Sequence, residues 1–301
     1  MSQNIPRRTF LAAGAASLAA VAARADKTIE AKSKTPNGFM KATKYYMVKP
    51  GKTLVEKFQL LKDLGFDGIE LDAPRHDPKE VLAAKEATGL KVPGLVGSAH
   101  WSQPVSDPSA AVRAKGLEAL KKGLHEAKQY GASTILFVPA VVNKKTSYAD
   151  AYKRSQEEIR KAIPLAKELG VKIAIENVWN NFLLSPLEMA KYIDEFESDR
   201  VGVHFDVGNI VVYGWPEQWI RTLGKRILKL DIKEFSRAKA DKEGRYKGFD
   251  VPLLKGDCDW PAVMKALRDI EYVGWGAAEI AAGDKEYLAG VARDMDTIFG
   301  Y

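Results

Sequence analysis

The chain alternates eight times between a short apolar run and a longer segment with helical periodicity, and this alternation constrains its fold most strongly. Parallel strands covered by helices on both faces are near-continuous apolar runs, as these are. The runs predict strands near residues 39–48, 68–72, 92–100, 133–140, 171–177, 201–208, 227–235 and 274–280. Eight such units in residues 39–301 have the number and size of an α/β fold, a single (β/α)₈ TIM barrel. An open doubly wound sheet is the alternative, but no G-x-G-x-x-G motif follows the first strand.

The predicted helices have recognisable start and stop signals. They cover residues 53–64, 77–88, 109–130, 148–169 and 259–271, with further helices from Ser185, from Pro216 and at the C-terminal end. Ser185 and Asp259 are predicted N-caps. Glycines at 65, 89, 131, 170 and 224 stand where a left-handed C-terminal cap is favoured. Residues 236–258 form one long polar insertion after the seventh strand.

Residues 1–25 have the pattern of an export signal. The pair Arg7-Arg8 precedes Phe10 and Leu11, an alanine-rich stretch over 12–23, and an A-x-A cleavage site at 23–25. The stretch is shorter than the roughly 20 apolar residues that span a bilayer. We therefore predict a twin-arginine signal peptide, a flexible lead-in over 26–38, and a mature protein that is periplasmic or extracellular and not held in a membrane.

Charge and cysteine content exclude some classes of protein. The formal net charge is +7, from 46 basic and 39 acidic residues, and three of those basic residues lie in the predicted signal. No basic stripe is interleaved with aromatic residues, so a nucleic-acid partner is not expected. Cys258 is the only cysteine, which rules out an intramolecular disulfide.

Four consecutive predicted strands each have one carboxylate near their C-terminal end. These residues are Glu176, Asp206, Asp231 and Glu279. The C-terminal ends of barrel strands meet at one face, where active sites lie. Unpaired buried carboxylates repel each other and lose hydration, whereas a divalent cation removes that cost. Oxygen ligands favour one hard ion, Mn²⁺ or Mg²⁺. The alternative is that each carboxylate pairs with a lysine or caps a backbone amide.

A metal site of this kind suits chemistry beside a carbonyl group. The ion would stabilise an enediolate formed from a hydroxy-ketone. Glu176 and Glu279 come from strands three apart, so one can remove a proton and the other can return it on the opposite face. Aromatic and polar residues near the same strand ends are predicted to bind the substrate: His100, Trp101, Trp179, Asn209, Lys233 and Arg237.

Three stretches carry a family resemblance: Ile175-Glu176-Asn177-Val178-Trp179, Phe205-Asp206-Val207-Gly208-Asn209 and Lys233-Glu234-Phe235-Ser236-Arg237. Over residues 40–300 the chain resembles the sugar phosphate isomerase/epimerase superfamily, the xylose isomerase-like barrels. Within it, the chain is similar to the D-tagatose 3-epimerase and L-ribulose-5-phosphate 3-epimerase group. The resemblance implies metal ligands at Glu176, Asp206 and Glu279, acid–base roles for the two glutamates, and a substrate contact at Arg237.

One position departs from the family pattern. The chain reads Asp231-Ile232-Lys233-Glu234 where the family usually reads His-x-Lys-Asp. An aspartate can ligate the metal, but the added negative charge weakens the ion as a Lewis acid. Lys233 lies on the same strand face as Asp231, and we expect it to offset this charge.

We predict a divalent-metal-dependent isomerase or epimerase that acts on a ketose or related keto-sugar through an enediolate. A lyase is the main alternative, because the same proton abstraction from a 3-keto-glycoside can lead to β-elimination. A non-catalytic sugar-binding protein is the alternative from another class. The export signal argues against a phosphorylated substrate, since sugar phosphates are largely cytosolic. The sequence leaves the sugar and a homo-oligomeric state open.

Overall fold

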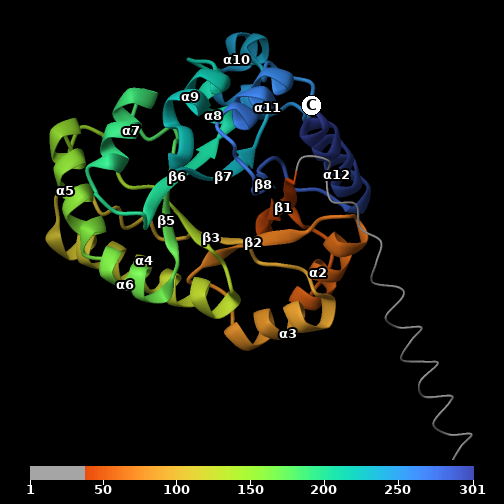
Figure 1. Ribbon diagram of the computed structural model, residues 1–301, viewed down its shortest axis with the longest axis horizontal. Coiled ribbons are helices and arrows are strands. Elements are labelled where there is room, and N and C mark those ends of the chain that lie inside the picture. Colours follow the sequence, from red (N-terminus) through yellow and green to blue (C-terminus); the bar gives the residue numbers. More distant parts are fainter. Residues whose placement is uncertain (1–37) are drawn as a thin grey trace, which may run out of the picture. The chain divides into compact units, whose positions relative to one another are not determined.

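Eight parallel strands close into a barrel in chain order in the computed structural model, which describes residues 38–301 (Figure 1). The strands are β1 (Met40–Lys44), β2 (Gly68–Ala73), β3 (Gly94–Gly97), β4 (Thr134–Phe137), β5 (Lys172–Glu176), β6 (Val201–Asp206), β7 (Ile227–Ile232) and β8 (Trp275–Ala278). β1 pairs with both β2 and β8, which places Ala42 opposite Gly68 on one side and Ala277 on the other. The predicted (β/α)₈ TIM barrel is confirmed. The predicted signal peptide lies outside the described residues.

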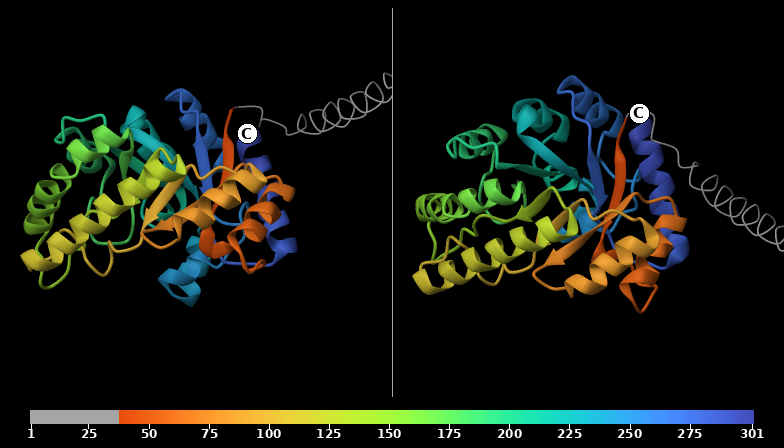
Figure 2. Two further views of the ribbon diagram at one scale, coloured as in Figure 1. Left: turned by 90° about the horizontal axis from the view of Figure 1, so that it is seen from below. Right: turned by 60° about the horizontal axis from the view of Figure 1, so that its bottom comes forward.

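Helices follow the strands and cover the outside of the barrel, as α3 and α4 show in both views of Figure 2. They are η1 (Tyr45–Met47), α2 (Leu54–Asp63), α3 (Pro78–Thr88), α4 (Ala110–Tyr130), α5 (Tyr148–Arg160), α6 (Ile163–Leu169), α7 (Pro186–Asp194), α8 (Val207–Val211), α9 (Pro216–Leu223), η2 (Gly224–Arg226), α10 (Arg237–Glu243), η3 (Arg245–Phe249), α11 (Trp260–Asp269) and α12 (Lys285–Gly300). Ser185 and Asp259 cap α7 and α11 as predicted, by accepting hydrogen bonds from Glu188 and Ala262. No helix within residues 38–301 is both long and apolar enough to cross a bilayer.

Two predicted helix boundaries are wrong for local reasons. The helix expected over 148–169 is divided into α5 and α6, because Pro164 lacks the N–H that would continue the ladder. Gly224 has a positive φ, but its ψ of −135° is not that of a left-handed cap. Gly224 instead begins the 3₁₀ turn η2, which leads into β7.

The polar insertion over residues 236–258 contains ordered structure, α10 and η3. Its base is tied to the barrel by the buried carboxylate of Glu234. Oε1 of Glu234 accepts a hydrogen bond from the Cys258 amide at 3.0 Å, and Oε2 accepts from Leu254 at 3.0 Å and from the Trp260 indole at 2.8 Å. The insertion is therefore anchored beside the C-terminal end of β7.

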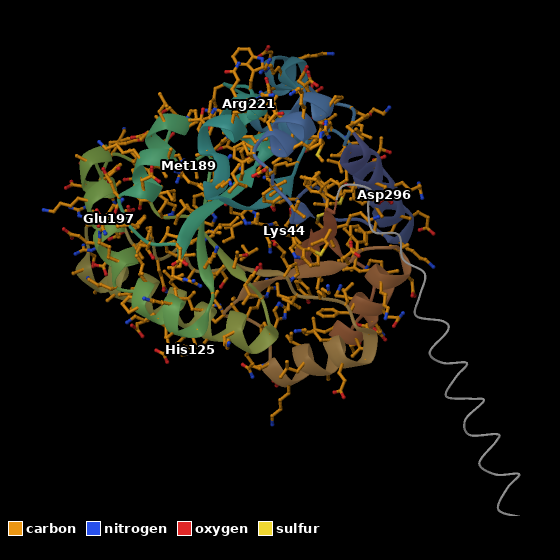
Figure 3. All side chains as sticks on the ribbon, viewed as in Figure 1. Lys44, His125, Met189, Glu197, Arg221 and Asp296 are labelled. Carbon is orange, nitrogen blue, oxygen red and sulfur yellow. The ribbon has the colours of Figure 1, made fainter. Side chains whose placement is uncertain are left out.

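The barrel interior is polar as well as apolar. Glu70 of β2 accepts hydrogen bonds from Lys44 of β1 and Lys229 of β7, each at 2.6 Å, and all three side chains are buried. Figure 3 shows Lys44 in the middle of the ring of strands. Charged groups thus lie inside the barrel, at and below the strand ends that form its mouth. On the outer face of the barrel, Lys41 of β1 pairs with Asp296 of α12 at 2.6 Å, which holds the last helix beside the first strand.

Candidate active site

Four carboxylates converge at the C-terminal mouth of the barrel. Glu176 and Asp206 are the last residues of β5 and β6, Asp231 lies in β7, and Glu279 follows β8 directly. One oxygen of each lies within 4.8 Å of the others. The strand register explains the approach, because Asp206 stands opposite Asp231, and Asp231 opposite Ala277 near the end of β8. The structure therefore brings the four predicted metal ligands together.

Two asparagines hold the first two carboxylates in place. The side chain of Asn177 bridges β5 and β6, donating to the Asp206 carbonyl at 2.7 Å and accepting from the Asp206 amide at 2.9 Å. Asp206 caps α8 by accepting from the Asn209 amide at 2.9 Å. The side-chain nitrogen of Asn209, Nδ2, lies 3.0 Å from the backbone carbonyl oxygen of Asn177 and 3.5 Å from Oε1 of Glu176. The two asparagines thus position Glu176 and Asp206 relative to each other.

Two lysines enter the cluster from different strands. Nζ of Lys233 lies 2.9 Å from Oδ2 of Asp206 and 3.5 Å from Oε2 of Glu279. Nζ of Lys44 and Nε2 of His204 lie 2.7 and 2.9 Å from Oδ1 of Asp231. Lys233 was expected to offset the added negative charge; it does lie in the cluster, but its contacts are with Asp206 and Glu279 instead of Asp231. Lys233 follows β7 and reaches toward β6 and β8, and Lys44 reaches Asp231 from β1, two strands away around the closed barrel.

Some carboxylate oxygens in the cluster remain without a hydrogen bond. Within the described chain, both oxygens of Asp231 and Oε2 of Glu279 are buried and accept none. Oδ1 of Asp231 has ion-pair contacts with Lys44 and His204, and the Asp231 carboxyl lies close enough to the Glu279 carboxyl to share a proton or a cation with it. An unsatisfied buried acceptor costs about 1–3 kcal/mol, and more when it is charged. A set made only of carboxylate oxygens suits a hard divalent ion, so these residues fit such a metal. Lys233 contacts two of the carboxylates that would hold it, Asp206 and Glu279.

Burial and mutual repulsion shift the pKa values of these groups in different directions. Burial raises the pKa of Glu176 well above its ordinary value, and the charges of Glu279 and Asp206 raise it further. Burial alone would raise the pKa of Asp231, but His204 and Lys44 outweigh that effect and lower it. Burial would lower the pKa of Lys233, but Asp206 and Glu279 raise it well above its ordinary value. Lys233 therefore stays charged at neutral pH, whereas Glu176 holds a proton more readily than an ordinary glutamate.

A cavity of about 130 Å³ opens beside the cluster. Its lining consists of Lys44, Tyr46, Glu70, Asp72, Val96, His100, Trp101, Leu136, Glu176, Val178, Lys233 and Glu279. Both predicted acid–base residues, Glu176 and Glu279, face this space. Two larger depressions of about 520 and 370 Å³ lie at the N-terminal ends of β5 to β7. They lack the carboxylate cluster, and that face of a TIM barrel is not where active sites are built.

Three of the six predicted substrate-binding residues line the cavity: Lys233, His100 and Trp101. His100 is buried, and its Nδ1 accepts a hydrogen bond from the Val138 amide at 3.3 Å. Burial lowers the pKa of His100 to about 4, so the ring is neutral at pH 7. Trp101 is 51% exposed and lies edge-on to His100, which leaves an indole surface at the rim.

The other three lie around the cavity instead of lining it. Trp179 donates to the Asn209 carbonyl at 2.9 Å, and the guanidinium of Arg245 covers its ring at 4.3 Å from the centroid. Arg237 donates to the carbonyls of Val211 and Gly214 at 2.8 and 2.9 Å. In this arrangement the three residues support the loops of the mouth. Their role as substrate contacts stays a prediction.

Sequence reasoning missed the residues that β1, η1 and β2 contribute. Lys44, Tyr46, Glu70 and Asp72 all line the cavity. The available signal was the charged residue at the end of β1, Lys44, and the two carboxylates of β2, Glu70 and Asp72. A lysine near a strand end usually reaches solvent, so its pairing with Asp231 could not be read from sequence spacing.

The fold and this cluster define a class of protein: a TIM barrel with an acidic site at the C-terminal ends of its strands. Residues 58–296 match the family described as xylose isomerase-like TIM barrel. The chain belongs to this family.

Its relatives include sugar epimerases. The chain is 25% identical over 237 residues to the L-ribulose-5-phosphate 3-epimerase UlaE of Escherichia coli O1:K1 / APEC, covering 74% of this chain and 81% of that protein. Among solved structures, an L-ribulose 3-epimerase has a TM-score of 0.71 at 18% identity, covering 86% of this chain and 93% of the other. The 3-keto-D-glucoside 4-epimerase YcjR of E. coli has a TM-score of 0.72 at 17% identity, covering 87% and 98%. At these identities the structural likeness concerns the fold.

Proposed function

We propose that the protein is a divalent-metal-dependent epimerase or isomerase of a keto-sugar that works through an enediolate. The observation that carries the proposal is the position of Glu176 and Glu279, which line one cavity and meet Asp206 and Asp231 within 4.8 Å. The family and its epimerase relatives support the same reaction class.

The residues of the site would hold the metal ion and transfer the proton. Glu176, Asp206, Asp231 and Glu279 would hold the ion, which supplies Lewis acidity that stabilises an enediolate. One of Glu176 and Glu279 would accept the proton from the carbon beside the carbonyl, and the other would return a proton to that carbon. Asn177 and Asn209 hold Asp206 and Glu176 in position through hydrogen bonds.

A keto-sugar lyase is the second candidate, because the same base removes the same proton. The observation that favours it is the half-exposed aromatic rim of the cavity, where Tyr46 is 49% and Trp101 is 51% exposed. Such a rim can accept the leaving group of a glycoside. Release of that group with loss of mass separates a lyase from an epimerase. A non-catalytic sugar-binding protein would bind ligand without any exchange of carbon-bound hydrogen.

We also propose that the protein works outside the cytoplasm, in the periplasm or beyond the cell. The support is the sequence of residues 1–25, with its paired Arg7 and Arg8 and its A-x-A site. Replacing both arginines by lysine should retain the protein in the cytoplasm on cell fractionation. Unchanged export of that variant would contradict the twin-arginine route.

Deuterium exchange tests the proposed chemistry. The whole protein is loaded with Mn²⁺ or Mg²⁺ and incubated in D₂O with free ketoses, inososes and 3-keto-glucosides, and NMR follows the carbon-bound hydrogens. Exchange with retained mass, lost on chelation and restored by the metal, is the expected result. Exchange that survives complete metal removal would overturn the metal-dependent mechanism, and silence across the panel would favour the binding protein.

A further inference from the structure

We propose that the substrate of this site is an unphosphorylated sugar. This inference rests on the proposed function and deepens it. The comparisons leave both classes open, because they include an epimerase named for L-ribulose 5-phosphate and one named for L-ribulose. The charges that line the cavity distinguish the two.

The cations of the cavity are already engaged. Among the lining residues, all within the described chain, the lysine and arginine side chains are Lys44 and Lys233. Lys44 lies 2.6 Å from Glu70 and 2.7 Å from Asp231, and Lys233 lies 2.9 Å from Asp206. Protein sites recognise phosphate through charge-assisted hydrogen bonds from free Arg, Lys or backbone N–H groups. Neither lysine is free to give one without breaking a buried ion pair.

The side of the mouth across from the carboxylate cluster is apolar or negative. The lining residues from β2, β3 and β4 are Glu70, Asp72, Val96 and Leu136. Asp72 holds the nearby Arg75 guanidinium, with Nη1 at 2.5 Å from Oδ2. A phosphate placed there would meet two carboxylates, each already paired with a cation, and two aliphatic side chains.

The sum of charges points the same way. The lining has two lysines against four carboxylates, Glu70, Asp72, Glu176 and Glu279. A divalent ion, with Lys229 and Arg75 beside Glu70 and Asp72, would raise the positive charge to six, and Asp206 and Asp231 of the cluster raise the negative charge to six. The cavity therefore has no excess positive charge to hold a phosphate dianion.

A neutral sugar meets none of these penalties. Its hydroxyl groups can donate to carboxylate oxygens, and its C–H faces can pack on the exposed rings of Tyr46 and Trp101 at the rim.

Calorimetry with a matched pair of ligands tests the inference. The Mn²⁺-loaded protein is titrated with L-ribulose and with L-ribulose 5-phosphate, and the comparison is repeated with D-psicose and D-tagatose against their 6-phosphates. At least tenfold tighter binding of a free ketose than of its phosphate is expected. Equal or tighter binding of a phosphorylated member, or no binding of any free ketose, would overturn the proposal. Binding and deuterium exchange are separate readouts, so a preference for free sugar without exchange would count against the proposed reaction alone.

A variant pair isolates the charge effect. Asp72→Asn removes a lining carboxylate and frees Arg75. The ratio of the Kd of the phosphorylated ketose to the Kd of the free ketose should therefore fall at least threefold. Asp199→Asn frees Arg200, its partner at 2.6 Å, near the start of β6 and outside the cavity lining. This control should leave the preference unchanged. An equal change in both variants, or no change in Asp72→Asn, would remove Asp72 from this role.

Discussion

The Lys44 ammonium of β1 lies 2.7 Å from Oδ1 of Asp231 in β7, although the two residues are far apart in the sequence, and both side chains are buried. The aspartate that departs from the family pattern therefore has its own counter-charge. Lys44 also bonds Glu70 at 2.6 Å, so one ammonium joins β1, β2 and β7. A metal held by the carboxylates would therefore lie beside buried acidic groups, Glu70 and Asp231, whose negative charge Lys44 neutralises in part.

The Lys44→Met variant should be destabilised by about 3–5 kcal/mol, because it leaves Glu70 short of one partner and Asp231 with a weaker one in a buried setting. Chemical denaturation with a two-state fit measures the change. Lys225→Met is the control, since its pair with Glu271 is exposed and should contribute less than about 1 kcal/mol. Similar stability losses in the two variants would contradict the structural role of Lys44.

Glu176→Gln and Glu279→Gln should each lower the rate of deuterium exchange at least about a hundredfold, because a glutamine cannot take or return a proton. NMR of the exchanging hydrogen measures the rate. Glu243→Gln, on the exposed insertion helix α10, provides the matched control and should retain full exchange. Near-normal exchange in either test variant would remove that glutamate from the acid–base pair.

Trp101→Ala should raise KM about tenfold with little change in the free energy of unfolding, because the indole is half exposed and lines the cavity. Steady-state kinetics and thermal unfolding separate the two effects. Trp215 is similarly exposed but packs against the Arg237 guanidinium outside the cavity lining. Trp215→Ala should therefore leave KM unchanged, and an equal rise in KM for both variants would contradict the assignment.

His100 should make the folded protein less stable in mild acid. Burial lowers its pKa from 6.5 to about 4, so between these values the unfolded chain binds a proton that the folded protein does not. The contribution to stability is complete above pH 6.5 and is lost as the pH falls toward 4, by about 3 kcal/mol at most. Denaturation of wild type and His100→Gln from pH 7 to 4 should show the stability difference shrinking in that window. A difference independent of pH would contradict it.

Lys233→Met should strengthen the binding of Mn²⁺, because the ammonium shares Asp206 and Glu279 with any bound ion. A ligand at a hundred times its Kd stabilises a protein by about 2.7 kcal/mol, so Mn²⁺ should raise Tm in wild type. The rise at a fixed Mn²⁺ concentration should be larger in Lys233→Met than in wild type. Lys247→Met, an exposed lysine of η3, should match wild type. A smaller rise in Lys233→Met would show that Lys233 supports the ion instead of competing with it.

The sequence by itself determined the barrel, the caps at Ser185 and Asp259, and the four carboxylates at successive strand ends. These features depend on local rules: the alternation of apolar runs and helices, the preference of short polar side chains for N-caps, and the common direction of parallel strands. The third strand shows the limit of local rules. Its apolar run continues to His100, but β3 ends at Gly97 because the following residues leave the sheet to form the mouth.

Only the tertiary structure decided which cation meets which carboxylate. Lys233 was expected beside Asp231, two residues away, yet it pairs with Asp206 and Glu279. Lys44 reaches Asp231 instead, from the other end of the chain. Closure of the barrel sets these distances, because it brings β1 close to β7 and β8, which lie far from it in the sequence. A side chain's partner there depends on the direction in which it leaves its strand and on the space that its neighbours leave free.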